Sequence, residues 1–359
     1  MTTVTPNASG AQPPLPYATP AATGGATWAT ILAKVGPLIG LAFVVALFSA
    51  LTYNTFFTLN NFELILRQTA VVGIASLGMT MIIIAGGIDL SVGSAIAVVC
   101  VTIAWLLPHE LHDPGTGART LTGGVPPIVA ALGGIGVGLL IGLINGALTT
   151  GLKLAPFIIT LGMMSLLRGT AQEWADNTMV YPRNAGFLDF LLQPISPGSM
   201  WLLTPGVWLM VALALLVSGV LRYTRFGRYV FAIGSNEQTA RLCGVPVERT
   251  KLLVYGFAGV LFAIAGILQF SYLGMGDPTT AVGMELDIIA AVVIGGASLS
   301  GGQGTVLGSL VGALIMTVVA NGSSKMGWEN SRQLIITGVI IILAVALDRL
   351  RHRKSAASE

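Results

Sequence analysis

Charged side chains are scarce in this sequence of 359 residues, in which Asp, Glu, Lys and Arg together make up 9%. Soluble globular chains typically carry about 25%. Hydrophobic residues make up 54%, and the mean hydropathy is +0.82. A chain of this size with so little charge cannot cover a water-facing surface, which argues strongly against a water-soluble enzyme. The formal net charge of +3 is also too small to indicate a nucleic-acid partner.

Residues that would build a catalytic, metal or nucleotide site are also few. The two cysteines, Cys100 and Cys243, lie in an apolar run and a charged loop, so a disulfide is not expected. No Gly-Lys pair occurs, which excludes a phosphate-binding loop. The spacing within His109–Asp113 is not that of a zinc protease, and no nucleophile–base set is visible. We therefore predict no catalytic residue, metal or cofactor.

Residues 299–303 spell LSGGQ, a signature of ATP-binding-cassette ATPases. In this chain the five residues join two apolar runs and have no phosphate loop upstream. Motif matches count only in their structural context, so we interpret this match as coincidental.

Charge is absent from the first 33 residues, which are rich in Pro, Ala, Thr and Gly. A secretory signal needs a basic segment before its apolar core, so the first apolar run is predicted to be retained. We expect a disordered cytoplasmic tail over 1–30, a transmembrane domain over 31–350, and a basic cytoplasmic tail over 351–359.

Long apolar runs dominate the rest of the chain. A membrane helix needs about 20 apolar residues, and this criterion predicts an all-α integral membrane protein with about ten transmembrane helices. Two of the runs, 155–173 and 286–300, are short for a full crossing. The expected spans are 31–53, 63–85, 90–107, 125–150, 155–173, 201–221, 252–273, 286–300, 304–322 and 333–349.

Lys and Arg in the loops set the orientation, because they favour the cytoplasmic side. With ten alternating spans and both termini in the cytoplasm of a bacterial inner membrane, twelve of the 18 basic residues fall inside. The opposite orientation would reverse this bias. Trp105, Trp174, Trp201 and Trp328 then fall near the outer ends of spans, where an aromatic belt is common.

Glycine recurs every fourth residue in two of the spans, at Gly134, Gly138, Gly142 and Gly146 and again at Gly304, Gly308 and Gly312. Residues four apart share one helix face, and small residues let helices approach closely in lipid. These stripes are most simply explained by helix packing, with a substrate path or a contact between permease copies as the alternative. Residues 86–93 and 295–302 agree at five of eight positions, which leaves an internal duplication open.

The long inward loop, residues 222–251, carries six basic residues and two acidic ones. Ser235 with Gln238 fits a capping box that opens a short helix. Gly244 suits the left-handed stop after that helix, and Pro246 blocks its continuation. The loop is interpreted either as a docking element for a cytoplasmic partner or as a basic helix lying on the lipid surface.

The chain resembles the ribose/xylose/galactose-type ABC sugar permease family. The residues that carry the resemblance are Ile84–Gly93, Thr160–Met164 with Arg168–Gly169, Phe226–Asn236 followed by Ala240 and Gly244, and Glu285–Asp287 leading to Val293–Gly296. The resemblance implies a dimeric, BtuC-like, type II importer-like permease bundle without ATPase activity of its own. Its implied partners are a cassette ATPase, a periplasmic or extracellular sugar-binding protein, and a second permease copy or homologue.

Segment 227–246 resembles the coupling helix of that family. The residues expected to couple to the ATPase are Gly227, Arg228, Gly234, Ser235, Asn236, Gln238, Ala240, Arg241 and Gly244. The sequence suggests four further polar residues for the translocation path or its gating, namely Asp89, Ser91, Asn145 and Asp287. Ionisable groups inside membranes are costly and usually functional, but Asp89 is equally well placed to cap the following helix.

Asn145 and a further polar residue, Arg168, each have an ordinary alternative to a transport role. Asn145 is more simply explained by a hydrogen bond to a neighbouring helix. Arg168 is expected either to reach the lipid headgroups or to meet acidic groups of a binding protein.

The expected function is the transmembrane subunit of an ATP-driven monosaccharide importer. Three alternatives remain: an ABC permease for nucleosides, one for branched-chain amino acids, and an ion-driven carrier. The last would need more ionisable groups within the spans than this chain offers.

Overall fold

A computed structural model describes residues 28–112, 119–121, 123–194, 203–329 and 331–343. The expected tails lie outside these residues, except that Trp28–Thr30 belong to the first helix. Trp201 and Arg349 also lie outside them.

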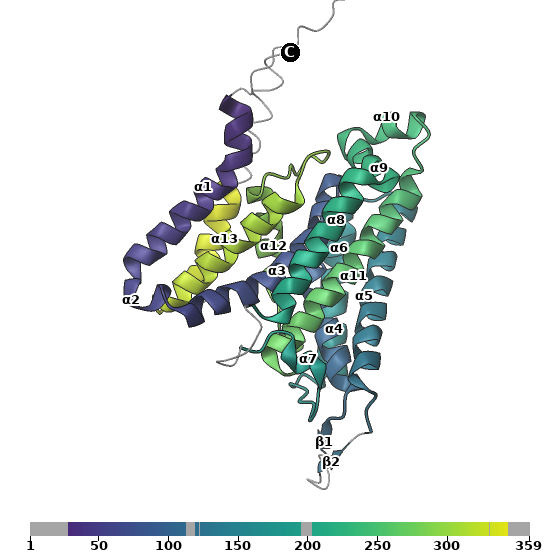
Figure 1. Cartoon of the computed structure of the whole chain (residues 1–359). Helices are drawn as coiled ribbons and strands as arrows, with labels where there is room; N and C mark the ends of the chain where they lie inside the picture. Colours follow the sequence, from purple (N-terminus) through teal and green to yellow (C-terminus); the bar gives the residue numbers. More distant parts are fainter. Residues whose placement is uncertain (1–27, 113–118, 122, 195–202, 330, 344–359) are drawn as a thin grey trace, which may run out of the picture.

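Helices form most of the described structure (Figure 1). The single sheet among the described residues is an antiparallel pair, β1 (Glu110–His112) and β2 (Arg119–Leu121). The labelled helices are α1 (Trp28–Leu51), α2 (Tyr53–Phe56), α3 (Leu59–Ile84), α4 (Val92–Leu106), α5 (Pro127–Gly151), α6 (Pro156–Trp174), α7 (Phe187–Phe190), α8 (Pro205–Tyr223), α9 (Arg225–Ser235), α10 (Glu237–Leu242), α11 (Val247–Leu273), α12 (Met284–Ile294) and α13 (Val306–Lys325). A further helix runs over Ser331–Leu343.

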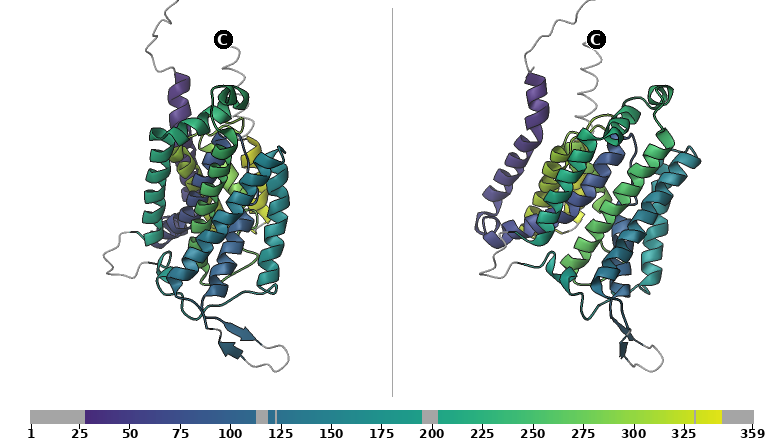
Figure 2. Two further views of the ribbon diagram at one scale, coloured as in Figure 1. Left: turned by 90° about the vertical axis from the view of Figure 1, so that its right-hand side faces the viewer. Right: turned by 45° about the vertical axis from the view of Figure 1, so that its right-hand side comes forward.

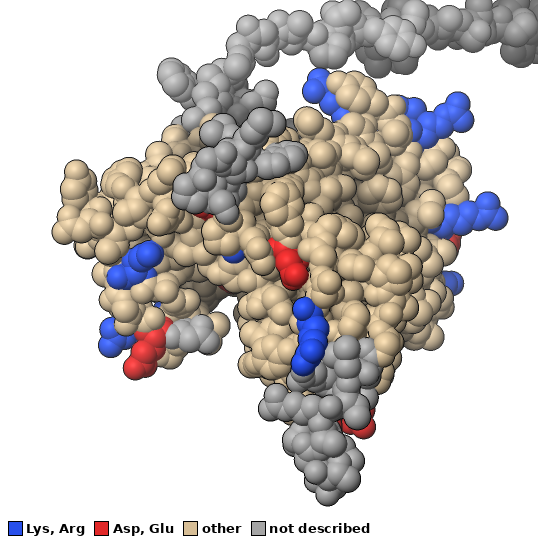
Figure 3. All heavy atoms as spheres, turned by 60° about the horizontal axis from the view of Figure 1, so that its bottom comes forward, with Lys and Arg blue, Asp and Glu red and all other residues tan. Residues whose placement is uncertain are grey.

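The long helices run between two opposite ends of the molecule (Figures 1 and 2). One end carries α9 and α10 and is called the α10 end. The other carries β1 and β2 and is called the hairpin end. In the space-filling view with the hairpin end turned forward, Lys, Arg, Asp and Glu form small separate groups on a broad uncharged surface (Figure 3). This is the surface expected of a body that faces lipid.

The helical membrane architecture predicted from the apolar runs is confirmed. Five helices are long and apolar enough to cross a bilayer: α3, α5, α8, α11 and α13. Shorter apolar helices cover 36–51, 92–106 and 331–343. Each of the ten predicted spans overlaps a helix of the described residues, but the count of ten crossings stays a prediction.

Helix α3 lies at the centre of the bundle. It packs against α8, α11, α12 and α13, and its second half is buried without interruption from Thr69 to Ile84. Its two ends are therefore well placed to connect features at opposite ends of the molecule.

The two glycine stripes pack helices against each other, as the simpler explanation predicts. A Cβ atom on Gly142 would overlap the carbonyl oxygen of Tyr255, and one on Gly259 would overlap the carbonyl oxygen of Gly138. These contacts press α5 onto α11. In the second stripe, a Cβ atom on Gly312 would overlap the carbonyl oxygen of Ala291, which presses α13 onto α12. Backbone is in contact with backbone at both seams, as is common where lipid removes the hydrophobic drive for helix association.

The crossing that contains α12 is broken. Helix α12 has 11 residues, about 16 Å at 1.5 Å per residue, whereas the hydrocarbon core is about 30 Å thick. Residues 274–283, which connect α11 to α12, are not α-helical. Irregular backbone at membrane depth must be covered by protein or line a cavity.

Residues outside the irregular segment satisfy its hydrogen-bonding groups. Arg168 of α6 donates from one nitrogen, Nη1, to the carbonyl oxygens of Pro278 (2.8 Å) and Thr280 (2.7 Å). Gln269 Nε2 donates to Thr280 Oγ1 at 2.8 Å, and Gly276 exchanges backbone hydrogen bonds with Val180. Arg168 thus hydrogen-bonds the chain's own backbone, and its expected contact with lipid headgroups or a binding protein stays a prediction.

Gly142→Ala should lower the free energy of unfolding by about 1–3 kcal/mol, because the new methyl group meets backbone that cannot move aside. The measurement is the thermal unfolding midpoint of the purified protein in detergent. Gly136→Ala on the same helix is the matched control, since no atom lies within 4 Å of the added Cβ. Equal midpoints for the two variants would contradict the packing role of the stripe.

Candidate functional site

Helices α9 and α10 form a compact element at the α10 end (Figure 1). It is called the α9–α10 element and covers Arg225–Leu242. Thr224 caps α9, with its Oγ1 accepting a hydrogen bond from Gly227 N at 3.1 Å. Gly227 itself is buried, and a Cβ atom there would overlap the Leu221 carbonyl oxygen. The turn from α8 into α9 therefore requires glycine.

The capping of α10 differs from the sequence prediction. Ser235 is the last residue of α9, and Asn236 is the N-cap of α10. Asn236 Oδ1 accepts a hydrogen bond from Thr239 N at 2.9 Å, so the predicted capping box of Ser235 with Gln238 is wrong by one residue. The physical reason is that α9 continues to Ser235, which leaves Asn236 as the extended residue between the two helices. Helix α10 itself is confirmed.

The end of α10 follows the prediction. Gly244 has a φ of +81°, in the left-handed region that favours glycine. Its amide donates to the Arg241 carbonyl, and the Val245 amide donates to the Ala240 carbonyl, both at 3.0 Å. The helix therefore stops sharply before α11 begins.

One face of α10 is packed and the other is open. Ala240 is buried in a small cluster with Ile233 and Val247, so it seats α10 on its neighbours instead of offering a contact surface. Leu242, on the other side, is 88% exposed. This side of α10 is therefore available for a contact with another molecule.

Ion pairs fix the direction of α10 relative to α11. Arg241 pairs with Glu237 (3.6 Å) and with Glu248, and Lys251 pairs with Glu237 (2.6 Å). The hydrogen bond and the charge of Glu248 raise the pKa of the Arg241 guanidinium above its usual range. Exposed pairs stabilise a fold little, so their effect is to hold one orientation.

The C-terminal end of α9 is wedged between two glycine turns. A Cβ atom on Gly234 would overlap the carbonyl oxygen of Ile84, at the end of α3, and would meet Gly302, in the turn between α12 and α13. Gly302 N also donates to the Ile84 carbonyl oxygen at 2.9 Å. The α9–α10 element thus contacts the α10 ends of both α3 and the α12–α13 pair.

These turns lie in the two similar segments 86–93 and 295–302, and the second contains the first four residues of LSGGQ, 299–302. Gly301 has a φ of +87° and lies against both Gly234 and Gly86. The glycines of LSGGQ are therefore explained by a close backbone contact, in agreement with the interpretation of the motif as coincidental.

The other residues predicted to couple, Arg228, Ser235, Asn236, Gln238, Arg241 and Gly244, are exposed at the α10 end. Together with the buried Gly227 and Ala240 and the half-buried Gly234, they form one contiguous region. Their coupling role stays a prediction.

Three of the four residues predicted for the path form a buried polar cluster. Asp89 Oδ1 accepts hydrogen bonds from Ser91 N (2.8 Å) and Ser91 Oγ (2.6 Å). Asn145 Nδ2 donates to Ser91 Oγ (2.8 Å) and to Asp89 Oδ2 (3.2 Å). All three side chains are at most 1% exposed. The cluster ties the start of α4 to α5, so Asn145 makes the helix contact given as its simpler explanation. Asp89 is not the cap of α4, because the N-cap is Ser91 and has no side-chain cap hydrogen bond.

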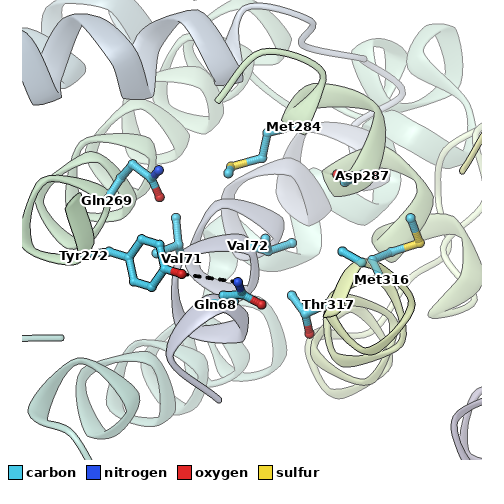
Figure 4. Close-up of a pocket in the computed structure, with 10 residues that line it drawn as sticks. Gln68, Val71, Val72, Gln269, Tyr272, Met284, Asp287, Met316 and Thr317 are labelled. Atoms are coloured by element: carbon cyan, nitrogen blue, oxygen red, sulfur yellow. Dashed lines mark hydrogen bonds between the residues drawn. The ribbon is translucent and has the colours of Figure 1, made fainter. Parts of the chain in front are cut away.

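The fourth residue, Asp287, lies elsewhere, in a cavity of about 200 Å³ (Figure 4). Polar side chains from four helices line this cavity: Gln68 of α3, Gln269 and Tyr272 of α11, Asp287 of α12 and Thr317 of α13. Gln68 Nε2 donates to the Tyr272 hydroxyl at 3.3 Å. Val71, Val72, Met284, Met316 and Ala320 complete the wall.

Sequence reasoning missed four of these five polar residues. Gln269 and Thr317 have apolar neighbours on both sides, and a polar residue in an apolar run is a signal for a membrane site. Gln68 and Tyr272 lie next to other polar residues and give no such signal. Only the packing of α3, α11, α12 and α13 shows that they converge. Leu242 was missed as well, because hydropathy alone does not distinguish an exposed leucine.

Comparisons with known proteins give a consistent result. Residues 61–345 match the family model described as branched-chain amino acid transport system / permease component. The ribose import permease protein of Escherichia coli K12 is 37% identical over 88% of this chain and 93% of its own length. The ribose import permease protein of Bacillus subtilis 168 is 38% identical over 91% of this chain and 95% of its own length. The fructose import permease protein of Rhizobium meliloti is 36% identical over 89% of this chain and 86% of its own length. No solved structure matches the chain.

Asp89→Leu should destabilise the protein more than Asp89→Asn. Leucine leaves the buried groups of Ser91 and Asn145 without their acceptor, at about 1–3 kcal/mol for each unsatisfied group. Asparagine keeps an oxygen for Ser91. Thermal unfolding in detergent measures the difference, and equal midpoints would show that the cluster does not hold α4 and α5 together.

Proposed function

The chain belongs to the family of branched-chain amino acid transport system / permease components, and from this premise we propose that it is the transmembrane permease subunit of an ATP-driven monosaccharide importer. It would form the translocation path and take its energy from a separate cassette ATPase. Relatives named for ribose, fructose and xylose import, each aligned over most of this chain, support the sugar assignment.

The distribution of charge supports a cytoplasmic α10 end. Seven basic residues among the described side chains lie there, against the acidic residues Glu237 and Glu248: Lys153, Arg222, Arg225, Arg228, Arg241, Arg249 and Lys251. Lys and Arg favour the cytoplasmic side of a membrane. The hairpin end would then face the periplasm or the exterior, both termini would lie in the cytoplasm, and the chain would cross the membrane ten times.

The observation that carries the proposal is the contact of Gly234 with Ile84 and Gly302. It joins the α9–α10 element to the α10 ends of α3 and of the α12–α13 pair. Further along, α3, α12 and α13 line the cavity with Gln68, Asp287 and Thr317. A displacement of α10 by the ATPase would therefore reach the cavity walls through stiff helices and backbone contacts.

The exposed side of α10 is the proposed docking surface for the ATPase. Leu242 would enter an apolar pocket on the partner, and Gln238 and Arg241 would lie around it. The hairpin end would receive a sugar-binding protein, and a second permease copy or homologue would complete the channel, as in the family that the sequence resembles.

The description of the matching family favours one alternative, a permease for branched-chain amino acids. An amino acid brings a carboxylate, which needs a cationic or amide-rich partner. Among the described residues that line the cavity around Asp287 there is no Lys or Arg. The first turn of α12 carries Glu285 and Asp287, which oppose an anion at that helix N-terminus. These features favour a neutral, hydroxyl-rich substrate. A nucleoside permease and an ion-driven carrier remain weaker alternatives.

Leu242→Asp should weaken capture of the ATPase subunit by about thirtyfold or more, since a central apolar anchor contributes about 2 kcal/mol or more to an interface. Co-purification and titration of the ATPase against the permease in nanodiscs measure the loss. Leu59→Asp is the matched control, because Leu59 is 84% exposed at the hairpin end. Unchanged capture by the Leu242 variant would remove α10 as the docking surface.

Gly234→Ala should separate docking from transport. The ATPase still binds, because the exposed face of α10 is intact, but sugar uptake falls at least about tenfold, since the added methyl group separates α9 from the two turns. Uptake into proteoliposomes and ATPase binding are measured together with the thermal midpoint. Gly219→Ala, which places its methyl group in open space, serves as the control. Full uptake by a stably folded Gly234→Ala protein would contradict the proposed transmission.

A further inference from the structure

The cavity around Asp287 continues toward the hairpin end. A second cavity of about 460 Å³ shares Gln68 and Ala320 with it and is otherwise lined by Leu64, Asn321, Ser324, Lys325 and Gln333. The two spaces adjoin along α3 and α13. Together they form a route from the hairpin end of the molecule to the start of α12.

This route contains a buried polar group without a partner. Asn321 is 4% exposed, and its Oδ1 accepts no hydrogen bond. A buried acceptor without a partner costs free energy, and a ligand hydroxyl would satisfy it. The unpaired oxygen is therefore an observation, independent of the cavity's shape, that points to a hydrogen-bonding ligand.

The inner cavity has the chemistry of a site for a neutral polyol. Gln68 and Gln269 supply amide donors and acceptors, Tyr272 and Thr317 supply hydroxyls, and Asp287 supplies a carboxylate (Figure 4). Hydroxyl groups donate and accept at once, so they pair with such a mixed set. The apolar wall of Val71, Val72 and Met284 suits the C–H face of a sugar ring.

The volume of the inner cavity narrows the choice of ligand further. The inner cavity of about 200 Å³ is below the roughly 300–1,000 Å³ of sites for drug-sized ligands. A monosaccharide fits this space better than a nucleoside, which adds a base to the sugar.

The hydrogen bonds around the cavity show how its walls are held. Gln269 donates to Thr280 of the irregular segment, and Gln68 donates to Tyr272 across the space between α3 and α11. Arg67, next to Gln68, places its guanidinium 5.3 Å from the centroid of the Tyr272 ring. Tyr272 is thereby fixed between two residues of α3.

We propose that this cavity is a sugar subsite within the permease, in which Asp287, Gln68 and Gln269 hydrogen-bond the hydroxyls of a monosaccharide. The proposal rests on the proposed function and extends it, because it assigns part of the substrate recognition to the permease itself. Asp287 is the principal residue, since a bond to a carboxylate is stronger than one to an amide.

The test uses a cysteine reporter in the complex of permease and ATPase in nanodiscs, without the binding protein. Ala320→Cys, in a Cys243→Ser background, places a thiol where the two cavities meet, and Cys100 is buried. D-ribose, D-xylose and D-fructose are the probes, and leucine is the competing class. A sugar at about ten times its dissociation constant should slow maleimide labelling about tenfold, because occupied sites are covered.

Three variants test which side chains bind the sugar. Asp287→Ala should raise the half-protecting sugar concentration about tenfold or more, and Gln269→Ala should raise it less. Asp277→Ala is the matched control. Its carboxylate accepts a hydrogen bond from Thr279 N at 2.8 Å within its own turn, and Asp277 is not among the residues lining the cavity. The half-protecting sugar concentration of this variant should stay within about twofold of the unsubstituted value. A Tyr181→Cys reporter on the exposed loop at the hairpin end should show no protection.

Labelling that no sugar slows, by a reporter variant that imports sugar in proteoliposomes with its ATPase and binding protein, would overturn the subsite and leave the proposed function standing. Protection by leucine alone would assign the cavity to an amino acid and overturn it as well. A complex that imports none of the three sugars with its ATPase and binding protein would instead count against the proposed function. Should Asp287→Ala not fold, Asp287→Asn and Gln269→Ala carry the same comparison.

Discussion

The close contact of Gly234 with the carbonyl oxygen of Ile84 is the constraint on which the rest of the arrangement depends. No side chain fits between these backbones, and Gly302 completes the contact with a hydrogen bond to the same carbonyl. Backbone-to-backbone contacts transmit displacement better than flexible side chains, because packed interiors are stiff. Through this point the α9–α10 element meets the two parts of the bundle that reach the cavity, α3 and the α12–α13 pair.

The broken crossing explains why a cavity exists at all. A continuous helix over 274–294 would place side chains all around its axis, whereas the irregular segment leaves the first turn of α12 facing a space between α3, α11 and α13. Arg168 and Gln269 satisfy the exposed backbone and side-chain groups of this segment. Segments interrupted in this way are found at the binding sites of other membrane transporters.

The sequence was sufficient for the architecture and for part of the site. The apolar runs located the helices, and the glycine stripes located the two closest helix seams. Gly244 was predicted to end α10 in the left-handed conformation that favours glycine, and it does so. The cap of α10 was wrong by one residue because the extent of α9 depends on packing against the glycine turns. Asp287 was found as a rare charge in an apolar run, but Gln68, Gln269, Tyr272 and Thr317 converge only through tertiary packing across more than two hundred residues of sequence.

The most direct test of the central contact is a pair of distance measurements between spin labels in the complex with the ATPase. One label is on Cys243, next to α10, and the second is on a cysteine placed at Ser300, in the glycine turn, or at Tyr181, in the exposed loop at the hairpin end. The account predicts that ATP binding changes the distance from Cys243 to residue 181 and leaves the distance from Cys243 to residue 300 constant, because α10 and the turn move as one body relative to that loop. A change in the distance from Cys243 to residue 300 would show that α10 moves independently of the turn and would contradict the account.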